Sequence, residues 1–186
     1  MTLTLRAARA SDATMLSALA CQVWLDTYAS SGISPAIAAY LHDTFAPPRF
    51  IERLADPQQL LTVAMQEDHL LGYAQLHTAS PCRAAPDLPV ELQTLYILKH
   101  ASGRGIGRQL LLLASTQAWQ YSATPLWLSV NAANARAITF YQRNGLQQIG
   151  EYDFMLGGQR YPNLLLAGSP ATPTHQQRPA HTGIKA

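Results

Sequence analysis

The chain has 186 residues, of which 48% are hydrophobic and 13% charged, a composition typical of a compact domain with a buried core. The net charge of +2 excludes the basic surface of a nucleic-acid-binding protein. Polar residues and Pro125 interrupt the longest uncharged run, 109–135, so no membrane span is expected. The two cysteines, Cys21 and Cys82, lack metal-site spacing. We therefore expect reduced thiols, no metal and a cytoplasmic protein without nucleic-acid or membrane partners.

The N-terminal part of the chain predicts one strand and three helices. Residues 3–8 alternate between apolar and polar side chains, as a strand does. Ser11 is placed to cap a helix over 12–28, whose apolar residues recur at helical spacing. A serine followed by proline begins a second helix over 34–45, and a pair of prolines begins a short third helix over 47–56.

The remaining pattern predicts strands interrupted by two helices. The expected elements are hairpin strands 60–66 and 70–77, a proline-rich loop 78–89, a strand 90–98, a helix 105–121, a strand 126–130, a helix 134–144 and strands 147–156 and 160–166. Residues 167–186 are rich in proline, threonine, histidine and glutamine, which predicts a disordered tail with solvated His175 and His181. One domain is thus expected over residues 1–166.

A glycine-rich segment, Ser102–Arg108, joins the strand 90–98 to an apolar helix. Unpaired N–H groups and the positive end of the dipole make a helix start an anion site. Glycines let a diphosphate approach the backbone, and arginines add charge at the rim. These residues are Gly103, Gly105, Gly107, Arg104 and Arg108. The segment lacks the Gly-Lys-Ser/Thr of a P-loop and the spacing of a dinucleotide fingerprint. A glycine-rich turn without a ligand is the alternative.

A second motif runs from Asn134 to Gly145 with the sequence Asn-Ala-Arg-Ala-Ile-Thr-Phe-Tyr-Gln-Arg-Asn-Gly. Asn134 and Tyr141 are seven residues apart, two helical turns, so both side chains can point toward one ligand. The alternative is structural: Asn134 caps the helix and Tyr141 packs in the core.

Together the two motifs resemble motifs A and B of the GNAT superfamily of N-acetyltransferases. Motif A is written Arg/Gln-x-x-Gly-x-Gly/Ala, and Ser102 stands at its first position; motif B is Asn-x-x-Ala-x-x-Phe-Tyr-x-x-x-Gly, and every defining position is filled. The resemblance covers about residues 3–166. It implies an α/β fold: a mixed, mainly antiparallel sheet of about seven strands flanked by helices. The strands before and after the helix 105–121 should be parallel neighbours, with the cofactor between them.

The resemblance implies acetyl-CoA as co-substrate. The pantetheine arm and the acetyl carbonyl should contact the backbone of 95–97, and the diphosphate should lie on the glycine-rich segment. The implied cofactor-binding residues are Leu95, Tyr96, Ile97, Ser102, Gly103, Arg104, Gly105, Ile106, Gly107, Arg108 and Asn134. Expulsion of a thiolate requires a proton, and the Tyr141 phenol is placed as the general acid.

Glu91 is the candidate general base, acting directly or through water, because the attacking amine must lose a proton. In some GNAT enzymes a matching strand position carries the catalytic glutamate. Strand periodicity predicts that Glu91 shares a face with Gln93, Leu95 and Ile97. Others use the next strand, where this chain has Ser129. His77 is a lesser candidate, and the alternative for Glu91 is an ordinary strand-end carboxylate.

The acceptor class is less specified. The chain most resembles the bacterial branch that includes spermidine/spermine N-acetyltransferases, although Asn163 and Ala132 stand where that branch has acidic residues. We predict acetyl transfer to a primary amine of a polyamine-like small molecule or of a peptide or protein, and a homodimer stays open. Carboxylates and aromatic rings for the acceptor are Asp26, Asp43, Glu91, Glu151, Asp153, Trp24, Tyr28 and Tyr40. The alternatives are a non-catalytic CoA-binding regulatory module and a nucleotide-binding protein.

Overall fold

The computed structural model describes residues 2–29 and 31–168. Its strands are β1 (Leu3–Ala7), β2 (Gln59–Gln66), β3 (His69–His77), β4 (Glu91–Ile97), β5 (Trp127–Asn131), β6 (Leu146–Leu156) and β7 (Gln159–Gly168). Its α-helices are α1 (Ala13–Tyr28), α2 (Pro35–Thr44), α3 (Pro47–Ala55), α4 (Ile106–Ser122) and α5 (Ala135–Arg143), with short 3₁₀ turns η1 (Ala10–Asp12) and η2 (Lys99–Ala101). The predicted elements are therefore present, with bounds that shift by a few residues at most.

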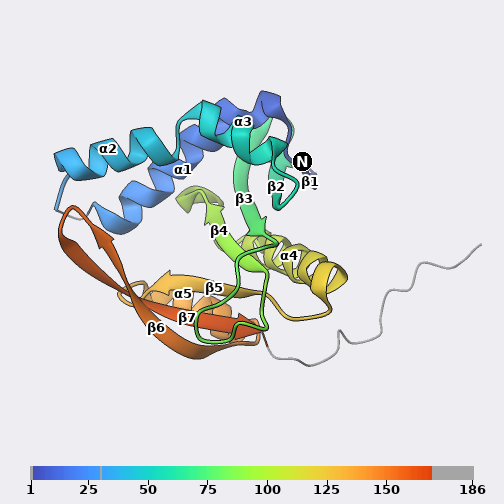
Figure 1. Ribbon diagram of the computed structural model, residues 1–186. Coiled ribbons are helices and arrows are strands. Elements are labelled where there is room, and N and C mark those ends of the chain that lie inside the picture. The colour runs from blue at the N-terminus through green and yellow to red at the C-terminus, as the bar shows by residue number, and fades with distance from the viewer. Residues whose placement is uncertain (1, 30, 169–186) are drawn as a thin grey trace, which may run out of the picture.

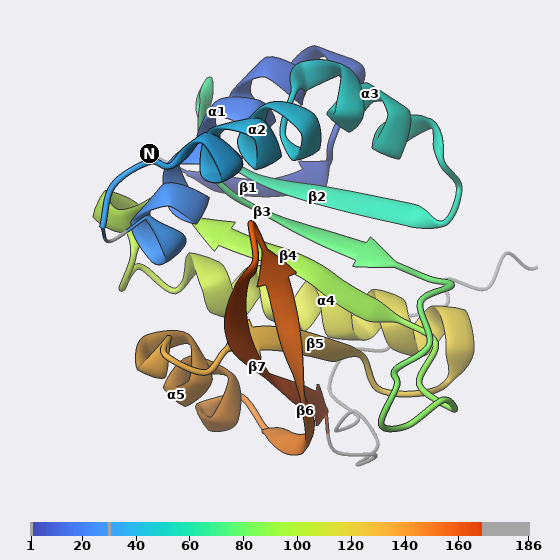
Figure 2. The same ribbon diagram turned by 60° about the vertical axis from the view of Figure 1, so that its left-hand side comes forward.

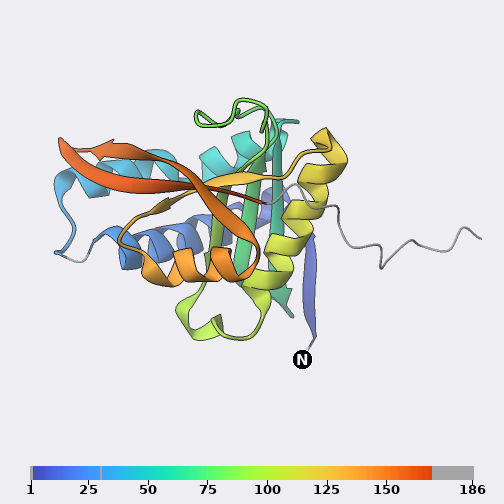
Figure 3. The ribbon, with the colours of Figure 1, turned by 90° about the horizontal axis from the view of Figure 1, so that it is seen from below.

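The strands form one seven-stranded sheet in the order β1-β2-β3-β4-β5-β7-β6 (Figure 1). Only β4 and β5 are parallel neighbours, and every other neighbouring pair is antiparallel. Helices α1, α2 and α3 cover one face of the sheet and α4 and α5 the other (Figure 3). We call these the α1–α3 face and the α4–α5 face. The predicted mixed, mainly antiparallel sheet is confirmed.

Helix starts follow the residue chemistry. The Ser34 hydroxyl accepts a hydrogen bond from the Ile37 N–H at 3.3 Å, as an N-cap does. At α1 the predicted cap is wrong: Ser11 lies inside η1, and the capping position belongs to Asp12. The Asp12 carboxylate is instead held by the Arg6 guanidinium at 2.7 and 2.9 Å, which lowers its pKa. A buried carboxylate needs such a partner, and Asp12 is 3% exposed.

The two parallel strands separate soon after they meet. Glu91 and Trp127 are the one register pair between β4 and β5, next to a 3.0 Å hydrogen bond from the Trp127 N–H to the Val90 carbonyl. Beyond that point the strands diverge toward the end where α4 and α5 begin (Figure 2). The sheet is thus closed at the start of β4 and open at its end, and we call this opening the splay.

The β6–β7 hairpin reaches across the splay to α1 and α2 (Figure 1). Tyr161 of β7 meets Tyr28 of α1 edge to face at 5.8 Å between ring centroids, and Phe154 of β6 meets Tyr40 of α2 at 6.0 Å. At the hairpin turn a Cβ on Gly157 would lie 2.8 Å from the Ala36 Cβ, so the turn packs tightly against α2. Aromatic contacts therefore connect the two sides of the splay.

At its C-terminal end β7 continues to Gly168, two residues past the predicted end at 166. The rest of the predicted tail, with His175 and His181, lies outside the described residues. Among the helices of the described part, none is long and apolar enough to cross a membrane. Cys21 and Cys82 are both free thiols.

Candidate active site

The start of α4 presents a row of backbone donors. Gly105 is the N-cap, and Gly103 and Gly105 have φ of 80° and 77°, a left-handed conformation that glycine adopts readily. The first helical bond is from the Gln109 N–H to the Gly105 carbonyl at 3.1 Å. The amides of residues 103–108 therefore have no hydrogen-bond acceptor within the described chain. Such amides, together with the helix dipole, favour an anion.

Ser102 differs from the residues that follow it. Its N–H is already used in a 3.2 Å hydrogen bond to the Lys99 carbonyl, and its hydroxyl lies 3.5 Å from the Leu98 carbonyl. Its amide is therefore not one of the unpaired donors. Ile106 is buried at 2% exposure and anchors the helix start in the core.

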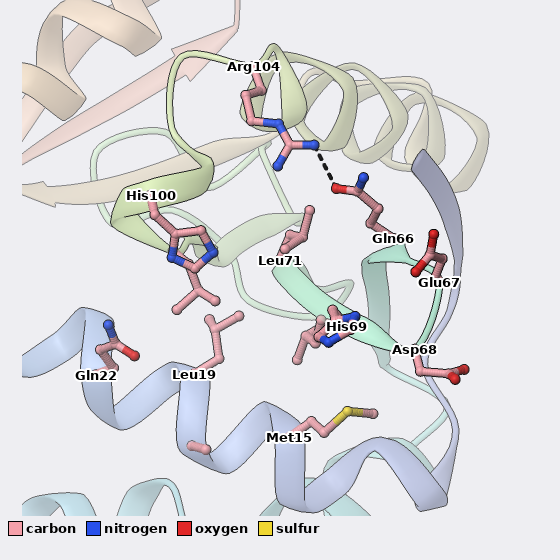
Figure 4. Close-up of a pocket in the computed structure, with 13 residues that line it drawn as sticks. Met15, Leu19, Gln22, Gln66, Glu67, Asp68, His69, Leu71, His100 and Arg104 are labelled. Atoms are coloured by element: carbon pink, nitrogen blue, oxygen red, sulfur yellow. Dashed lines mark hydrogen bonds between the residues drawn. The ribbon is translucent and has the colours of Figure 1, made fainter. Parts of the chain in front are cut away.

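The two arginines of the segment take different directions. Arg108 is exposed on the first turn of α4. The Arg104 guanidinium instead donates a 2.6 Å hydrogen bond to the Gln66 side chain at the end of β2, on the rim of a separate groove of about 550 Å³ (Figure 4). That groove also holds His69 and His100 and has an apolar floor that includes Leu19. In this conformation the Arg104 guanidinium is engaged by Gln66.

The packing around Gly107 leaves room for a side chain. A Cβ there would lie 3.5 Å from Phe140 of α5 and 3.8 Å from Ile97 of β4, which is ordinary van der Waals contact. Gly107 has no positive φ, so its backbone does not require glycine.

The end of β4 offers backbone groups to the splay. The Leu98 N–H donates to the Leu71 carbonyl at 3.0 Å, and antiparallel ladders alternate bonded and non-bonded pairs. Tyr96 opposite Tyr73 is then a bonded pair, whereas the peptide groups of Leu95 and Ile97 point away from β3, into the splay. Of the three residues predicted to contact the pantetheine arm, Tyr96 thus uses its peptide groups in hydrogen bonds to β3, and only Leu95 and Ile97 have peptide groups directed into the splay.

A groove of about 610 Å³ lies at the open end of the splay and is lined by residues from both sides of the splay. Among the residues that line it are Tyr28, Ile97, Ser102, Asn131, Asn134 and Tyr161. Asn134 is the N-cap of α5: its Oδ1 accepts a 3.0 Å hydrogen bond from the Ala137 N–H. Asn134 can therefore cap the helix and bind a ligand at the same time, because its Nδ2 group has no acceptor in the described part of the chain.

Tyr141 lies on α5 and packs in the core of the α4–α5 face, against which Leu95, Ile97 and Phe140 also pack. It is 8% exposed, and its hydroxyl has no hydrogen-bond partner among the described residues. Burial raises its pKa above the ordinary tyrosine value. The phenol therefore stays protonated at neutral pH, as a general acid must.

A β-bulge decides the orientation of Glu91. The register shifts between Gln75 and Leu76, so that Thr94 opposes Gln75 but Leu92 opposes Leu76, and Gln93 is the extra residue on β4. Glu91 consequently lies on the α1–α3 face. The predicted common face is wrong for Leu95 and Ile97, which pack on the α4–α5 face. Period-2 alternation fails wherever a strand bulges.

Glu91 is held by two donors. The Ser80 hydroxyl donates to its Oε2 at 2.7 Å, and the Gln93 Nε2 lies 3.4 Å from the same oxygen. The Ser80 carbonyl in turn accepts a 2.7 Å bond from the Trp127 indole N–H of β5. Ser80 thus joins both strands at the closed end of the splay. No sequence pattern pointed to Ser80, because it lies in the loop after β3.

The remaining acceptor candidates are mostly engaged by neighbours. Asp43 pairs with Arg49 at 3.0 Å, Asp153 pairs with Arg160 at 2.9 Å, and Glu151 accepts from Gln148 at 3.0 Å. Asp26 and Tyr28 line the groove, and the Trp24 ring stacks on Tyr28 at 4.6 Å and contacts Tyr40 in a tilted pair at 5.0 Å. In residues 2–29 and 31–168 no group of three or more His, Cys, Asp or Glu side chains could hold a metal ion.

Two curated relatives are similar to this chain in sequence. An uncharacterized N-acetyltransferase of Mycobacterium tuberculosis (strain ATCC 25618 / H37Rv) is 30% identical over 147 residues, which cover 79% of this chain and 90% of the relative. A probable spermine N(1)-acetyltransferase of Bacillus subtilis subsp. natto is 39% identical over 66 residues, covering 35% of this chain and 43% of that protein.

Solved structures share the fold. The PaiA N-acetyltransferase of Thermoplasma acidophilum, in complex with coenzyme A, has a TM-score of 0.72 at 21% identity and covers 90% of this chain and 99% of its own. The putative acetyltransferase YncA of Salmonella typhimurium, with acetyl-CoA, has a TM-score of 0.65 at 15% identity over 97% of this chain and 99% of its own. The model of the acetyltransferase (GNAT) family matches residues 20–146, and this chain belongs to that family.

Proposed function

We propose that this protein transfers the acetyl group of acetyl-CoA to a primary amine in a ternary complex. The observation that carries the proposal is the row of unpaired amides over residues 103–108, at the start of α4 and at the end of the sheet where β4 and β5 diverge (Figure 2). A diphosphate on those amides leaves the pantetheine arm to enter between β4 and β5, where the peptide groups of Leu95 and Ile97 are free. Asn134 adds an amide donor at the entrance.

The proton transfers assign one role to each face of the sheet. On the α1–α3 face, Glu91 accepts through water the proton that the amine loses as its nitrogen bonds to the acetyl carbon. On the α4–α5 face, Tyr141 donates its hydroxyl proton to the sulfur as the carbon–sulfur bond breaks. The amine gives one proton and the thiolate gains one, so both residues return to their starting state by exchange with solvent.

The acceptor proposed is a small primary amine. The β6–β7 hairpin packs on α1 and α2 through aromatic contacts, which reduces the space through which an acceptor can reach the splay from that side. Few carboxylates remain for a multiply charged polyamine, since Asp43 and Asp153 are paired with arginines. A polyamine is therefore the less favoured small amine, although a partial relative carries the name of a spermine acetyltransferase. A peptide amine is the second acceptor class to test.

The first experiment is a thermal melt with coenzyme A, ATP and NAD, followed by thiol release from acetyl-CoA over a panel of amines. We expect coenzyme A alone to raise the melting temperature and at least one monoamine to release thiol faster than spermidine does. Protection by coenzyme A without thiol release for any amine would favour the non-catalytic CoA-binding module. Protection by ATP or NAD but not by coenzyme A would contradict the site itself.

A further inference from the structure

Three glutamines on neighbouring strands form a chain of hydrogen bonds on the α1–α3 face. The Gln75 Nε2 of β3 donates to the Gln59 Oε1 of β2 at 3.0 Å and to the Gln93 Oε1 of β4 at 2.9 Å. The chain lies at the bulge, because Gln75 stands where the register shifts and Gln93 is the extra residue of β4. Gln75 is 3% exposed, whereas Gln93 is an exposed residue. The chain therefore connects a buried amide to an exposed one.

This glutamine chain ends on the proposed base. The Gln93 Nε2 donates to the Glu91 Oε2 at 3.4 Å, the same oxygen that accepts from the Ser80 hydroxyl at 2.7 Å. The last torsion of a glutamate side chain has broad preferences, so a carboxylate keeps one orientation only where donors hold it. Both donors act on Oε2, and Oε1 has no donor within the described residues. The two hydrogen bonds therefore fix the carboxylate and leave Oε1 available to the reaction.

The charge of Glu91 sets the direction of the whole chain. A carboxylate only accepts hydrogen bonds, whereas a glutamine amide has a donor end and an acceptor end. Gln93 must therefore turn its NH₂ group toward Glu91 and its carbonyl oxygen toward Gln75, which in turn must donate. A reversed Gln75 would place two carbonyl oxygens against each other, and buried polar groups need partners. Gln75 thus holds Gln93 in the orientation that Glu91 requires.

We propose that Gln75 is a positioning residue for acetyl transfer that acts through Gln93 on the carboxylate of Glu91, an inference that rests on the proposed function. Gln75 is buried and contacts neither the acceptor nor acetyl-CoA. Its NH₂ group fixes Gln93, which together with Ser80 fixes the Glu91 Oε2. Loss of Gln75 therefore lowers turnover and leaves substrate binding unchanged. Gln59 accepts from the same nitrogen but lies on β2, across β3 from Glu91, so it has no part in this effect.

Steady-state kinetics of thiol release by the full-length chain tests the inference. Gln75→Met keeps the length of the side chain but removes its donor, and Gln59→Met is the matched control, because it removes the other partner of the same nitrogen. With the best amine of the panel, we expect Gln75→Met to lower kcat about three- to tenfold, the loss that one hydrogen bond produces. The KM values for acetyl-CoA and for the amine should stay unchanged. Gln59→Met should keep the wild-type kcat.

A double variant tests whether Gln75 acts through Gln93. Gln93→Met removes the donor that reaches Glu91, so it should lower kcat by about as much as Gln75→Met does. The double variant should be no slower than the slower single variant, because both changes remove the same hold on the carboxylate. A packing role for Gln75 predicts instead that the two losses add.

The outcomes separate this inference from the function on which it rests. Wild-type kcat in Gln75→Met, an equal loss in Gln59→Met, or additive losses in the double variant would each overturn the role of Gln75. If Gln75→Met does not fold, the exposed Gln93→Met takes its place, and wild-type kcat in that variant overturns the inference equally. Loss of activity in Glu91→Gln beside wild-type kcat in Gln75→Met removes only Gln75. Wild-type kcat in Glu91→Gln removes the base and the positioning role together, and no thiol release from the wild-type chain removes the proposed function as well.

Discussion

Replacing Tyr141 with phenylalanine tests the acid role with little disturbance of the fold. The hydroxyl has no hydrogen-bond partner among the described residues, so its removal leaves no neighbour unsatisfied. We therefore expect the free energy of unfolding to change by less than about 0.5 kcal/mol. Loss of a general acid lowers kcat by about 10²–10⁴-fold, which corresponds to roughly 3–5 kcal/mol of activation free energy.

The assay measures kcat and the acetyl-CoA dissociation constant of Tyr141→Phe together with its urea unfolding curve. Turnover should fall, whereas acetyl-CoA binding and stability should stay near the wild-type values. Tyr73→Phe is the matched control, because Tyr73 is fully buried and its hydroxyl also lacks a partner, but it lies on the α1–α3 face. Wild-type kcat in Tyr141→Phe, or an equal loss in both variants, would refute the assignment of the acid.

Three further outcomes are expected. Gly105→Ala and Gly145→Ala both place alanine at positive φ, 77° and 88°, in open space, and each should cost about 1–2 kcal/mol of stability. Only Gly105→Ala should weaken coenzyme A binding in calorimetry. Equal binding by both variants would contradict the amide site. Gly72→Ala brings a Cβ to 2.5 Å from the Ile97 Cδ1, so the free energy of unfolding measured in urea should fall by about 1–3 kcal/mol. An unchanged urea midpoint would contradict this and mean that β4 shifts at no cost. Burial raises the pKa of Tyr28 to about 12, above the value near 10 of an unfolded chain, so stability present below about pH 10 should be lost as the pH rises toward 12; a urea midpoint equal at pH 8 and pH 11 would contradict this.

Short sequence patterns predicted most of the secondary structure and part of the candidate site. The cap at Ser34 and the glycines before α4 encode their structure within a few residues, because caps and positive φ values depend on near neighbours. The apolar runs of β2 and β3, joined at Glu67 and Asp68, likewise predicted the observed hairpin. The cap of α1 was missed because a tertiary ion pair with Arg6 determines where Asp12 lies.

The sequence by itself determined the elements, the glycine-rich helix start and the Asn134–Tyr141 helix, since each of these depends on spacing along a short stretch of chain. Only the tertiary structure decided which face of β4 carries Glu91, because one bulged residue reverses the alternation of a strand. It also decided that Ser80 donates to that carboxylate, that His77 is the register partner of Glu91 on β3 and that Arg104 turns toward Gln66. These contacts join strands and loops distant in sequence, and no local pattern encodes a pairing register.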